Sequence, residues 1–180
     1  MRLALTGGSG FIGGRFVESA LREGIAGRSP SILALTSSEE SAGRVLSKHP
    51  AARAIPLPGL DHDSLIEAMR GCEALIHAAW STVPAEAERD PLKDLHVNVE
   101  SSIKLFQAAI AAGVRRIVFI SSGGTVYGEP RWSPITEDHP LLPLSAYGTS
   151  KLCAEHYLLS LARAARIDHH PHIGNGQRGF

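Results

Sequence analysis

The sequence lacks an excess of charge of either sign, because its 18 basic residues are balanced by 18 acidic residues. Nothing in this balance favours binding to nucleic acid or to an anionic membrane surface. Long apolar runs are also absent: none approaches the roughly 20 residues that a membrane-spanning helix needs, and the N-terminus has no extended apolar core of a secretory signal. We therefore expect no nucleic-acid partner and no membrane partner.

Cysteine is scarce as well, and the two residues present, Cys72 and Cys153, lie far apart without the spacing of a metal site. This usage is typical of reduced thiols in a cytoplasmic protein. The histidines near the C-terminus do not predict a metal site either, because the adjacent His169 and His170 would face apart in a strand. We therefore predict a cytoplasmic localisation and no bound metal.

Apolar and helical segments alternate along the rest of the chain. We expect strands at residues 2–6, 31–36, 53–57, 73–79 and 114–122, helices at 11–23, 63–70, 92–112 and 146–166, a polar helical stretch after the second strand, and a loop at 123–144. The strands are nearly continuous apolar runs, which is typical of a parallel sheet covered by helices on both faces. Right-handed crossovers then favour an α/β fold with a doubly wound sheet of strand order 3-2-1-4-5.

A glycine-rich turn joins the first expected strand to the first expected helix, in the segment TGGSGFIG at residues 6–13. Gly7 or Gly8 permits a tight turn, whereas Gly10 lets a pyrophosphate approach the backbone. Gly13 lets the helix pack closely on the strand. The start of the helix then offers free amide groups and a partial positive charge to phosphates. At the first strand of a doubly wound sheet, the segment predicts a Rossmann-like site for a nicotinamide dinucleotide.

The choice between NAD and NADP depends on the end of the second strand. An acid about 20 residues after the turn usually accepts the ribose hydroxyls of NAD there. The segment reads LTSS at residues 35–38, with no acid before Glu39 and no arginine before Arg44. Hydroxyl groups from Thr36 to Ser38 can serve either a free ribose or a 2′-phosphate, so the sequence leaves NAD and NADP both open.

Tyr147 and Lys151 form a Y-x-x-x-K pattern at the start of the last expected helix. Spacing of four places both side chains on one helix face, about one turn apart. The ammonium group of Lys151, helped by the oxidised nicotinamide, would lower the pKa of the Tyr147 phenol from its reference value of about 10. A phenolate can then take a proton from a substrate hydroxyl while a hydride leaves the same carbon for the cofactor. The pair therefore predicts coupled proton and hydride transfer.

Several segments together resemble the extended short-chain dehydrogenases, and within them the NAD-dependent epimerase/dehydratase family, of which UDP-glucose 4-epimerase is the best-known type. They are TGGSGFIG, SSGGTVYG at residues 121–128, ITEDHPLLPLSAYGTSK at residues 135–151, and Asn98 within HVNVES. The resemblance covers residues 2–166 and implies a nucleotide-sugar substrate. It also implies that Tyr147 is the acid/base, that Lys151 holds the nicotinamide ribose and tunes the tyrosine, and that Asn98 lies near the cofactor.

The chain departs from this family at one catalytic position. In the epimerases a serine or threonine follows the paired serines and hydrogen-bonds the reacting oxygen, but the matching residue here is Gly123. Ser122 or Thr125 can supply the hydroxyl instead, and either can equally be a structural loop residue. The candidate catalytic residues are therefore Tyr147 and Lys151, with Ser122 or Thr125.

The resemblance also implies a set of cofactor contacts. Small residues at the end of the fourth strand should line the cofactor site, and Trp80 to Thr82 follow them in the sequence. We expect NAD, or else NADP, to contact Gly7, Gly10, Phe11, Ile12, Gly13, Thr36, Ala78, Ala79, Asn98 and Ser121, together with Tyr147 and Lys151.

The last residues match the family poorly. Relatives continue into a sixth strand and then a sugar-binding domain, whereas residues 167–180 read IDHHPHIGNGQRGF. Histidine and proline are poor residues for a parallel strand, so a sixth strand is doubtful. We expect a dinucleotide-binding domain at residues 1–166, a truncated or irregular tail at 167–180, no substrate domain, and little turnover by this chain alone.

Three functions therefore stay open on the sequence alone. The first is an NAD(P)-dependent epimerase or dehydratase of a nucleotide sugar, impaired in this chain. The second is a non-catalytic NAD(P)-binding module, and the third is a carbonyl reductase of the same superfamily. The helices at 92–112 and 146–166 carry more apolar residues than a single buried stripe would need. Through the resemblance, these residues predict a homodimer formed by the two helices.

Overall fold

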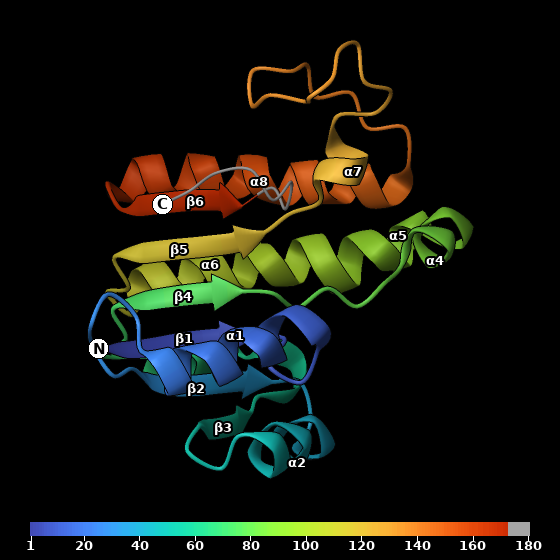
Figure 1. Ribbon diagram of the computed structural model, residues 1–180. Helices are drawn as coiled ribbons and strands as arrows, with labels where there is room; N and C mark the ends of the chain where they lie inside the picture. Colours follow the sequence, from blue (N-terminus) through green and yellow to red (C-terminus); the bar gives the residue numbers. More distant parts are fainter. Residues whose placement is uncertain (173–180) are drawn as a thin grey trace.

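The computed structural model describes residues 1–172 and contains a six-stranded parallel sheet of order β3-β2-β1-β4-β5-β6 (Figure 1). The strands are β1 (Arg2–Thr6), β2 (Ser31–Thr36), β3 (Arg53–Pro56), β4 (Ala74–His77), β5 (Arg116–Ile120) and β6 (Asp168–His172). The helices are α1 (Phe11–Glu23), α2 (Glu39–Lys48), η1 (Pro58–Leu60), α3 (His62–Met69), α4 (Pro84–Arg89), α5 (Pro91–Asp94), η2 (Leu95–Glu100), α6 (Ser101–Ala111), α7 (Gly123–Val126) and α8 (Ala146–Ala165). The predicted Rossmann-like fold is confirmed.

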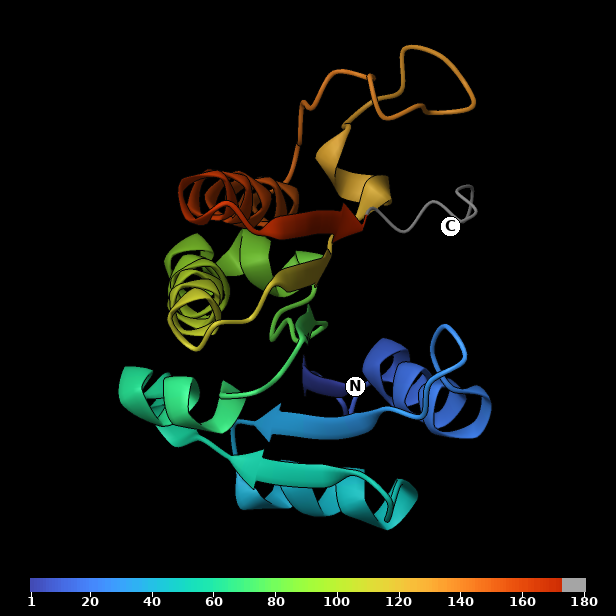
Figure 2. The same cartoon turned by 90° about the vertical axis from the view of Figure 1, so that its left-hand side faces the viewer.

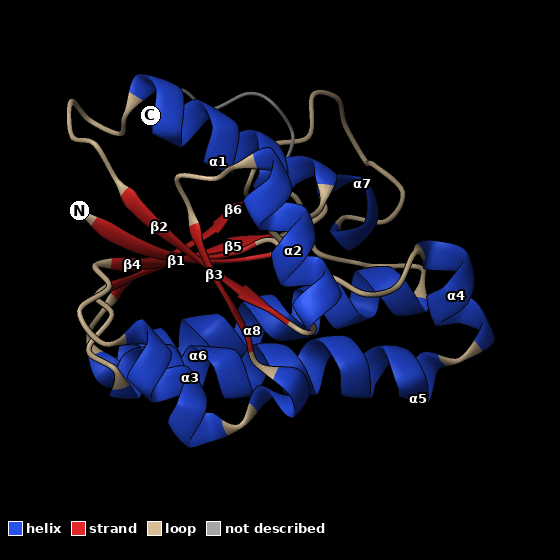
Figure 3. Cartoon of the chain, turned by 90° about the horizontal axis from the view of Figure 1, so that it is seen from below, coloured by secondary structure: helices blue, strands red, loops and turns tan. Residues whose placement is uncertain are grey.

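Helices cover both faces of the sheet, with α1 and α2 on one side and α3, α6 and α8 on the other (Figure 3). Successive strand residues therefore enter different cores: Leu5 packs with Val17 of α1, whereas its neighbour Ala4 packs with Leu105 of α6. Because side chains alternate across a strand, burial on both faces requires apolar residues at every position. This requirement explains the continuous apolar runs that predicted the parallel sheet.

The expectation of an irregular tail from residue 167 is wrong for residues 168–172, which form β6. This strand runs parallel to β5, with Asp168 opposite Arg116 and His172 opposite Ile120. It lies at the edge of the sheet that residues 1–172 form, and a proline, which lacks an N–H group, is tolerated in an edge strand. Pairing with β5 thus outweighs the low strand propensity of the segment. The other tail residues lie outside the described part of the chain.

The long helix expected at residues 92–112 consists of three consecutive segments. These are α5, a π-helical segment η2, and α6. The π-helical segment contains Asn98, and such segments frequently occur at functional sites. The short helices α4 and α7 lie in regions for which the sequence predicts no helix. The segment between α7 and α8 extends past the β6 side of the sheet (Figure 2).

Within residues 1–172, no helix combines the length and the apolar character that crossing a bilayer requires. Cys72 is buried and Cys153 is half-buried, and both are free thiols. Burial raises the pKa of each thiol, since it disfavours the thiolate. Neither residue therefore has the lowered pKa that marks a reactive cysteine.

Candidate functional site

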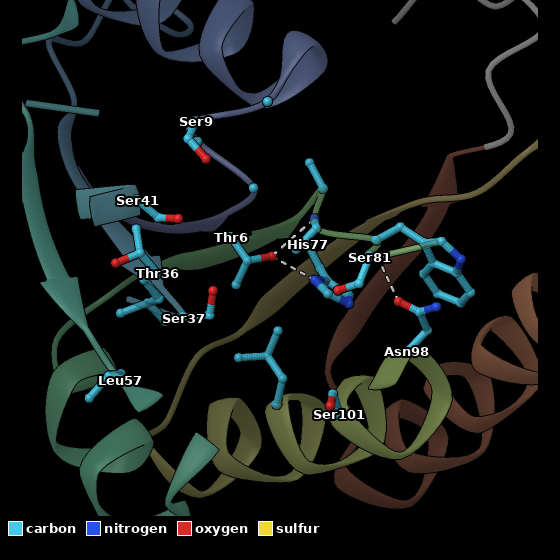
Figure 4. Close-up of a pocket in the computed structure, with 18 of the residues that line it drawn as sticks. Thr6, Ser9, Thr36, Ser37, Ser41, Leu57, His77, Ser81, Asn98 and Ser101 are labelled. Atoms are coloured by element: carbon cyan, nitrogen blue, oxygen red, sulfur yellow. Dashed lines mark hydrogen bonds between the residues drawn. The ribbon is translucent and has the colours of Figure 1, made fainter. Parts of the chain in front are cut away.

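A cleft of ≈ 760 Å³ lies at the carboxyl ends of the central strands (Figure 4). Its lining comes from the turn after β1, from the residues after β2 and β4, and from η2 and the start of α6, and includes Thr6, Gly7, Gly8, Ser9, Gly10, Thr36, Ser37, His77, Ala78, Ala79, Trp80, Ser81, His96, Asn98 and Ser101. The order of strands reverses between β1 and β4, and open α/β sheets bind ligands at this reversal point.

The turn after β1 is packed so closely that side chains are excluded from it. Gly7 has a φ of +75°, and a Cβ on it would lie 2.6 Å from the carbonyl carbon of Ala78. A Cβ on Gly13 would lie 2.3 Å from the carbonyl oxygen of Gly7. The N–H group of Gly10 donates to the same oxygen at 3.0 Å. The bare backbone and the N-terminus of α1 therefore fit a pyrophosphate, as the glycine pattern predicts.

Asn98 holds the wall of the cleft that follows β4. Its side-chain oxygen accepts a hydrogen bond from the N–H of Ser81 at 2.7 Å. Its side-chain nitrogen donates to Thr82 Oγ1 and to Asp94 Oδ1, each at 2.8 Å. Thr82 Oγ1 in turn donates to Asp94. Asn98 thus links the loop after β4 to the π-helical segment.

His77 at the end of β4 is a neutral, fully bonded side chain. The hydroxyl of Ser102 donates to the carbonyl oxygen of Asn98 at 2.6 Å, so its oxygen accepts from Nε2 of His77 at 2.9 Å. Nδ1 is then unprotonated and accepts from the hydroxyl of Thr6 at 2.6 Å. Burial, and secondarily the charge of Lys151, lowers the pKa of His77 from 6.5 to about 3.

Tyr147 and Lys151 lie together on α8, next to Trp80 but outside the lining of the cleft. The Lys151 ammonium donates to the carbonyl oxygen of Ile120 at 2.8 Å. It also lies 3.9 Å from the ring centroid of Trp80, in cation–π geometry. The rings of Trp80 and Tyr147 meet edge-on with centroids 6.0 Å apart. Trp80 both lines the cleft and contacts Lys151.

Burial shifts the pKa values of both Tyr147 and Lys151. Burial raises the pKa of Tyr147 above 10, and the nearby carboxylate of Asp94 raises it further. Lys151, only 4% exposed, has a pKa lowered by burial from 10.5 to about 7. The lowering of the Tyr147 pKa expected from the sequence includes the oxidised nicotinamide beside the phenol, so it concerns the cofactor-bound site and stays a prediction.

The predicted hydroxyl-bearing residues after β5 also lie outside the cleft lining. Ser121 is buried and donates to the carboxylate of Glu155. Burial raises the pKa of Glu155, and the Ser121 hydrogen bond opposes this shift. The hydroxyl of Thr125 donates to the carbonyl oxygen of Ser122 at 3.2 Å, within the short helix α7.

The structure thus divides the predicted cofactor residues into three groups. Six line the cleft, namely Gly7, Gly10, Thr36, Ala78, Ala79 and Asn98. Phe11 and Ile12 are exposed at the start of α1, and Gly13 packs behind the turn. Ser121, Tyr147 and Lys151 approach from α8 and the end of β5.

Other lining residues were not predicted as contacts. Leu57 and Gly59 follow β3, and Ser41 and Arg44 lie on α2. The sequence could have indicated these four residues, because they follow strands whose carboxyl ends meet at one edge of the sheet. His96 had no such signal, because its position depends on the π-helical segment.

Comparison with known proteins identifies the class. The profile of the NAD dependent epimerase/dehydratase family matches residues 3–169, and the chain belongs to this family. It is 34% identical to a UDP-glucose 4-epimerase of Mycolicibacterium smegmatis over 164 residues, covering 88% of this chain and 50% of that protein. It is 36% identical to a UDP-glucose 4-epimerase of Azospirillum brasilense, covering 87% and 43% of the two chains.

Solved structures agree with this assignment. A dTDP-glucose 4,6-dehydratase from Streptomyces venezuelae with NAD and TYD bound superposes with a TM-score of 0.82 at 28% identity, covering 94% of this chain and 54% of that one. A UDP-glucose 4-epimerase from Thermotoga maritima with UDP-glucose has a TM-score of 0.81 at 26% identity, covering 94% and 53%. The chain spans about half the length of the relatives it matches.

The neutral state of His77 predicts an acid-sensitive stability. The folded chain keeps His77 neutral down to about pH 3, whereas the unfolded chain protonates it below about pH 6.5. The unfolded state therefore binds more protons in this window, and stability falls as the pH is lowered, by about 1.4 kcal/mol per pH unit for one proton.

Urea unfolding between pH 6.5 and 5 measures this slope before most carboxylates titrate. His77→Asn should flatten it, and the matched change at an exposed histidine, His156→Asn, should leave it unchanged. Equal slopes in the wild type and His77→Asn would show that His77 is not the titrating group.

Proposed function

We propose that the chain is the dinucleotide-binding part of an NAD-dependent epimerase or dehydratase that acts on a nucleotide sugar. The observation that carries this proposal is the glycine turn at the strand reversal point, where a Cβ on Gly13 would lie 2.3 Å from the carbonyl oxygen of Gly7. A backbone packed this closely against the start of α1 has the form of a pyrophosphate site. Membership of the family and the ligands named for related structures support the same cofactor and substrate class.

Each part of the cleft has a role in holding the dinucleotide. The amides from Gly7 to Gly10 and the N-terminus of α1 would bind the pyrophosphate. Ala78 and Ala79 offer small side chains beside the cofactor, and Asn98 keeps that wall in place through its bond to Ser81. When bound, NAD supplies the acceptor for a hydride from a sugar carbon.

Tyr147 and Lys151 would carry the proton. The phenolate oxygen of Tyr147, stabilised by the ammonium of Lys151, would take the proton of a sugar hydroxyl and become a neutral phenol. The two side chains share one face of α8, and Trp80 contacts both. Trp80 also lines the cleft, so the pair lies beside it. The hydroxyl of Thr125 or Ser122 would serve in place of the side chain that Gly123 lacks.

A non-catalytic dinucleotide-binding module is the second candidate. Two observations favour it: Gly123 has no hydroxyl at the position where relatives use one, and Lys151 is bound to Ile120 beneath Trp80 instead of lining the cleft. Such a module would bind the cofactor without turnover.

Cofactor binding tests the proposal most directly. Gly13→Ala should lower the affinity for NAD by about 10-fold or more, because its Cβ would displace α1 from the turn. Gly14→Ala is the matched control, since a Cβ there would lie 3.4 Å from the carbonyl oxygen of Gly8, at an ordinary contact distance. Calorimetric titration of the wild type and both variants measures the affinities. Failure of wild-type protein to bind either NAD or NADP at millimolar concentration would disprove the proposal.

Turnover separates the enzyme from the inert module. Tyr147→Phe removes the proton-transferring oxygen, so the rate of UDP-glucose epimerisation should fall by about 100-fold or more. Tyr157→Phe changes an exposed tyrosine on the same helix and should retain the wild-type rate. A measurable wild-type rate that Tyr147→Phe abolishes would exclude the non-catalytic module, and a rate that Tyr147→Phe leaves unchanged would show that Tyr147 does not transfer the proton.

We further propose that the chain forms a homodimer through α5–η2 and α8. Leu92 and Leu95 on the first segment and Tyr157 on α8 keep large apolar surfaces exposed, and Leu92 is 71% exposed. A shallow groove beside Tyr157 includes Leu152 and Cys153. Exposed apolar groups on adjacent helices favour association.

Light scattering at micromolar concentration should give twice the monomer mass. Leu92→Asp should shift the population toward monomer, whereas Leu144→Asp, at an equally exposed leucine outside these helices, should not. A monomeric mass for the wild-type chain would exclude the dimer at that concentration.

A further inference from the structure

A buried carboxylate lies one helical turn after Lys151 on α8, at Glu155. The residue is only 4% exposed, and glutamate is almost never buried to this extent unless it is paired. Spacing of four places Glu155 on the helix face that carries Lys151. Neither the glycine turn nor the proton transfer proposed for Tyr147 and Lys151 uses this carboxylate. Its burial therefore calls for a separate explanation.

The two side chains of α8 bond consecutive residues at the carboxyl end of β5. The ammonium of Lys151 donates to the carbonyl oxygen of Ile120 at 2.8 Å. The carboxylate of Glu155 accepts a hydrogen bond from the hydroxyl of the next residue, Ser121. Both bonds join one face of α8 to the same end of one strand. Glu155 therefore fixes the strand end to which the Lys151 ammonium is bound.

The closest contacts of the Lys151 ammonium carry no negative charge. Besides its bond to a carbonyl oxygen, the ammonium lies 3.9 Å from the ring centroid of Trp80 and 4.9 Å from that of Phe119. Burial among these groups lowers the pKa of Lys151 to about 7, and the charges of Glu155 and then Asp94 oppose this lowering. Carboxylates are therefore what keeps a proton on Lys151 near neutral pH.

The neighbours of Glu155 support its ionised form. Burial raises the pKa of its carboxyl group, whereas the hydrogen bond from Ser121 lowers it. The charges of His156 and Lys151 lower the same pKa. A hydroxyl that donates to a carboxylate favours the charged form of that carboxylate. The bond from Ser121 thus supports the negative charge that acts on Lys151.

Two further titratable groups, on neighbouring elements, interact electrostatically with Lys151. Asp94 of α5 is the second carboxylate, but its Oδ1 already accepts a hydrogen bond from Asn98 in the wall of the cleft. His77 of β4 is neutral and adds no charge. Among the described side chains, Glu155 is the carboxylate that shares both the helix and the strand end of Lys151.

We propose that Glu155 is a positioning residue of the proton-transfer pair, which fixes the end of β5 through Ser121 and keeps the Lys151 ammonium protonated through its negative charge. This inference rests on the proposed function, in which a charged Lys151 stabilises the Tyr147 phenolate. Glu155 does not line the cleft, so it acts through Lys151. Without the carboxylate, the ammonium should lose its proton at a lower pH.

Nuclear magnetic resonance of the 180-residue chain with ¹³Cε-labelled lysine tests the proposal. The chain has four lysines, and the Lys151 signal is assigned by its loss in Lys151→Arg. In the wild type, this signal should titrate with a midpoint near pH 7, as the pKa of about 7 predicts. Glu155→Gln removes the charge but keeps an oxygen that can accept from Ser121. This variant should move the midpoint to lower pH by about 0.5 or more.

Three further variants separate charge from packing. Glu100→Gln is the matched control, because Glu100 also lies one turn from a lysine, Lys104, at 2.7 Å, but on the exposed surface. It should leave the Lys151 midpoint unchanged. Glu155→Asp keeps the charge, so its midpoint should lie closer to the wild type than that of Glu155→Gln. Ser121→Ala removes the hydroxyl donor without changing α8 and should lower the midpoint as well, which keeps the test available if Glu155→Gln does not fold.

The outcomes distinguish this inference from the proposed function. An unchanged Lys151 midpoint in folded Glu155→Gln, or in Ser121→Ala if that variant alone folds, would overturn the proposal. Equal lowering by Glu155→Asp and Glu155→Gln would overturn the role of the charge. The titration uses no cofactor, so either result leaves the dinucleotide site in place. Failure of the wild type to bind NAD would instead overturn the proposed function, whatever the Lys151 midpoint.

Discussion

The contact between two backbone segments at the turn after β1 positions the rest of the site. A Cβ on Gly13 would lie 2.3 Å from the carbonyl oxygen of Gly7, and a Cβ on Gly7 would lie 2.6 Å from the carbonyl carbon of Ala78, so neither position has room for a side chain. These contacts hold the N-terminus of α1 at the carboxyl ends of β1 and β4. A free helix N-terminus at this point gives the cleft its electrostatic preference for an anion. The absence of side chains is therefore the constraint on which the site depends.

A buried polar network then sets the opposite wall. His77 bonds Thr6 on one strand and Ser102 on α6, while Asn98 bonds the loop after β4. Buried polar groups are costly unless they are bonded, so these groups specify one arrangement of β4 relative to the π-helical segment. The same segment carries Asn98 as its central residue. The position of the loop after β4 and the π-helical form of η2 are thus two consequences of one hydrogen-bond network.

Burial shifts the pKa values of Tyr147 and Lys151, the proposed catalytic pair. Lys151 is enclosed by Trp80, Phe119 and the carbonyl oxygen of Ile120, and its pKa falls to about 7. Tyr147 shares this environment, and its pKa rises. Both shifts have one cause, since a low-dielectric environment disfavours charge on an acid and on a base alike. A positively charged cofactor ring beside the phenol would counteract the shift on Tyr147.

The sequence by itself determined the strand order, the position of the glycine turn and the Tyr147–Lys151 spacing, because each follows from short-range patterns of apolar residues, glycines and helical periodicity. Only the tertiary structure decided that residues 168–172 complete the sheet, since pairing with β5 stabilises a segment of low strand propensity. It also decided that Trp80 covers Lys151 and that Arg44 reaches the cleft. The pairing of β6 and the contact of Trp80 with Lys151 join residues that are distant in sequence, and the position of Arg44 depends on the path of α2. Local sequence patterns do not encode such contacts.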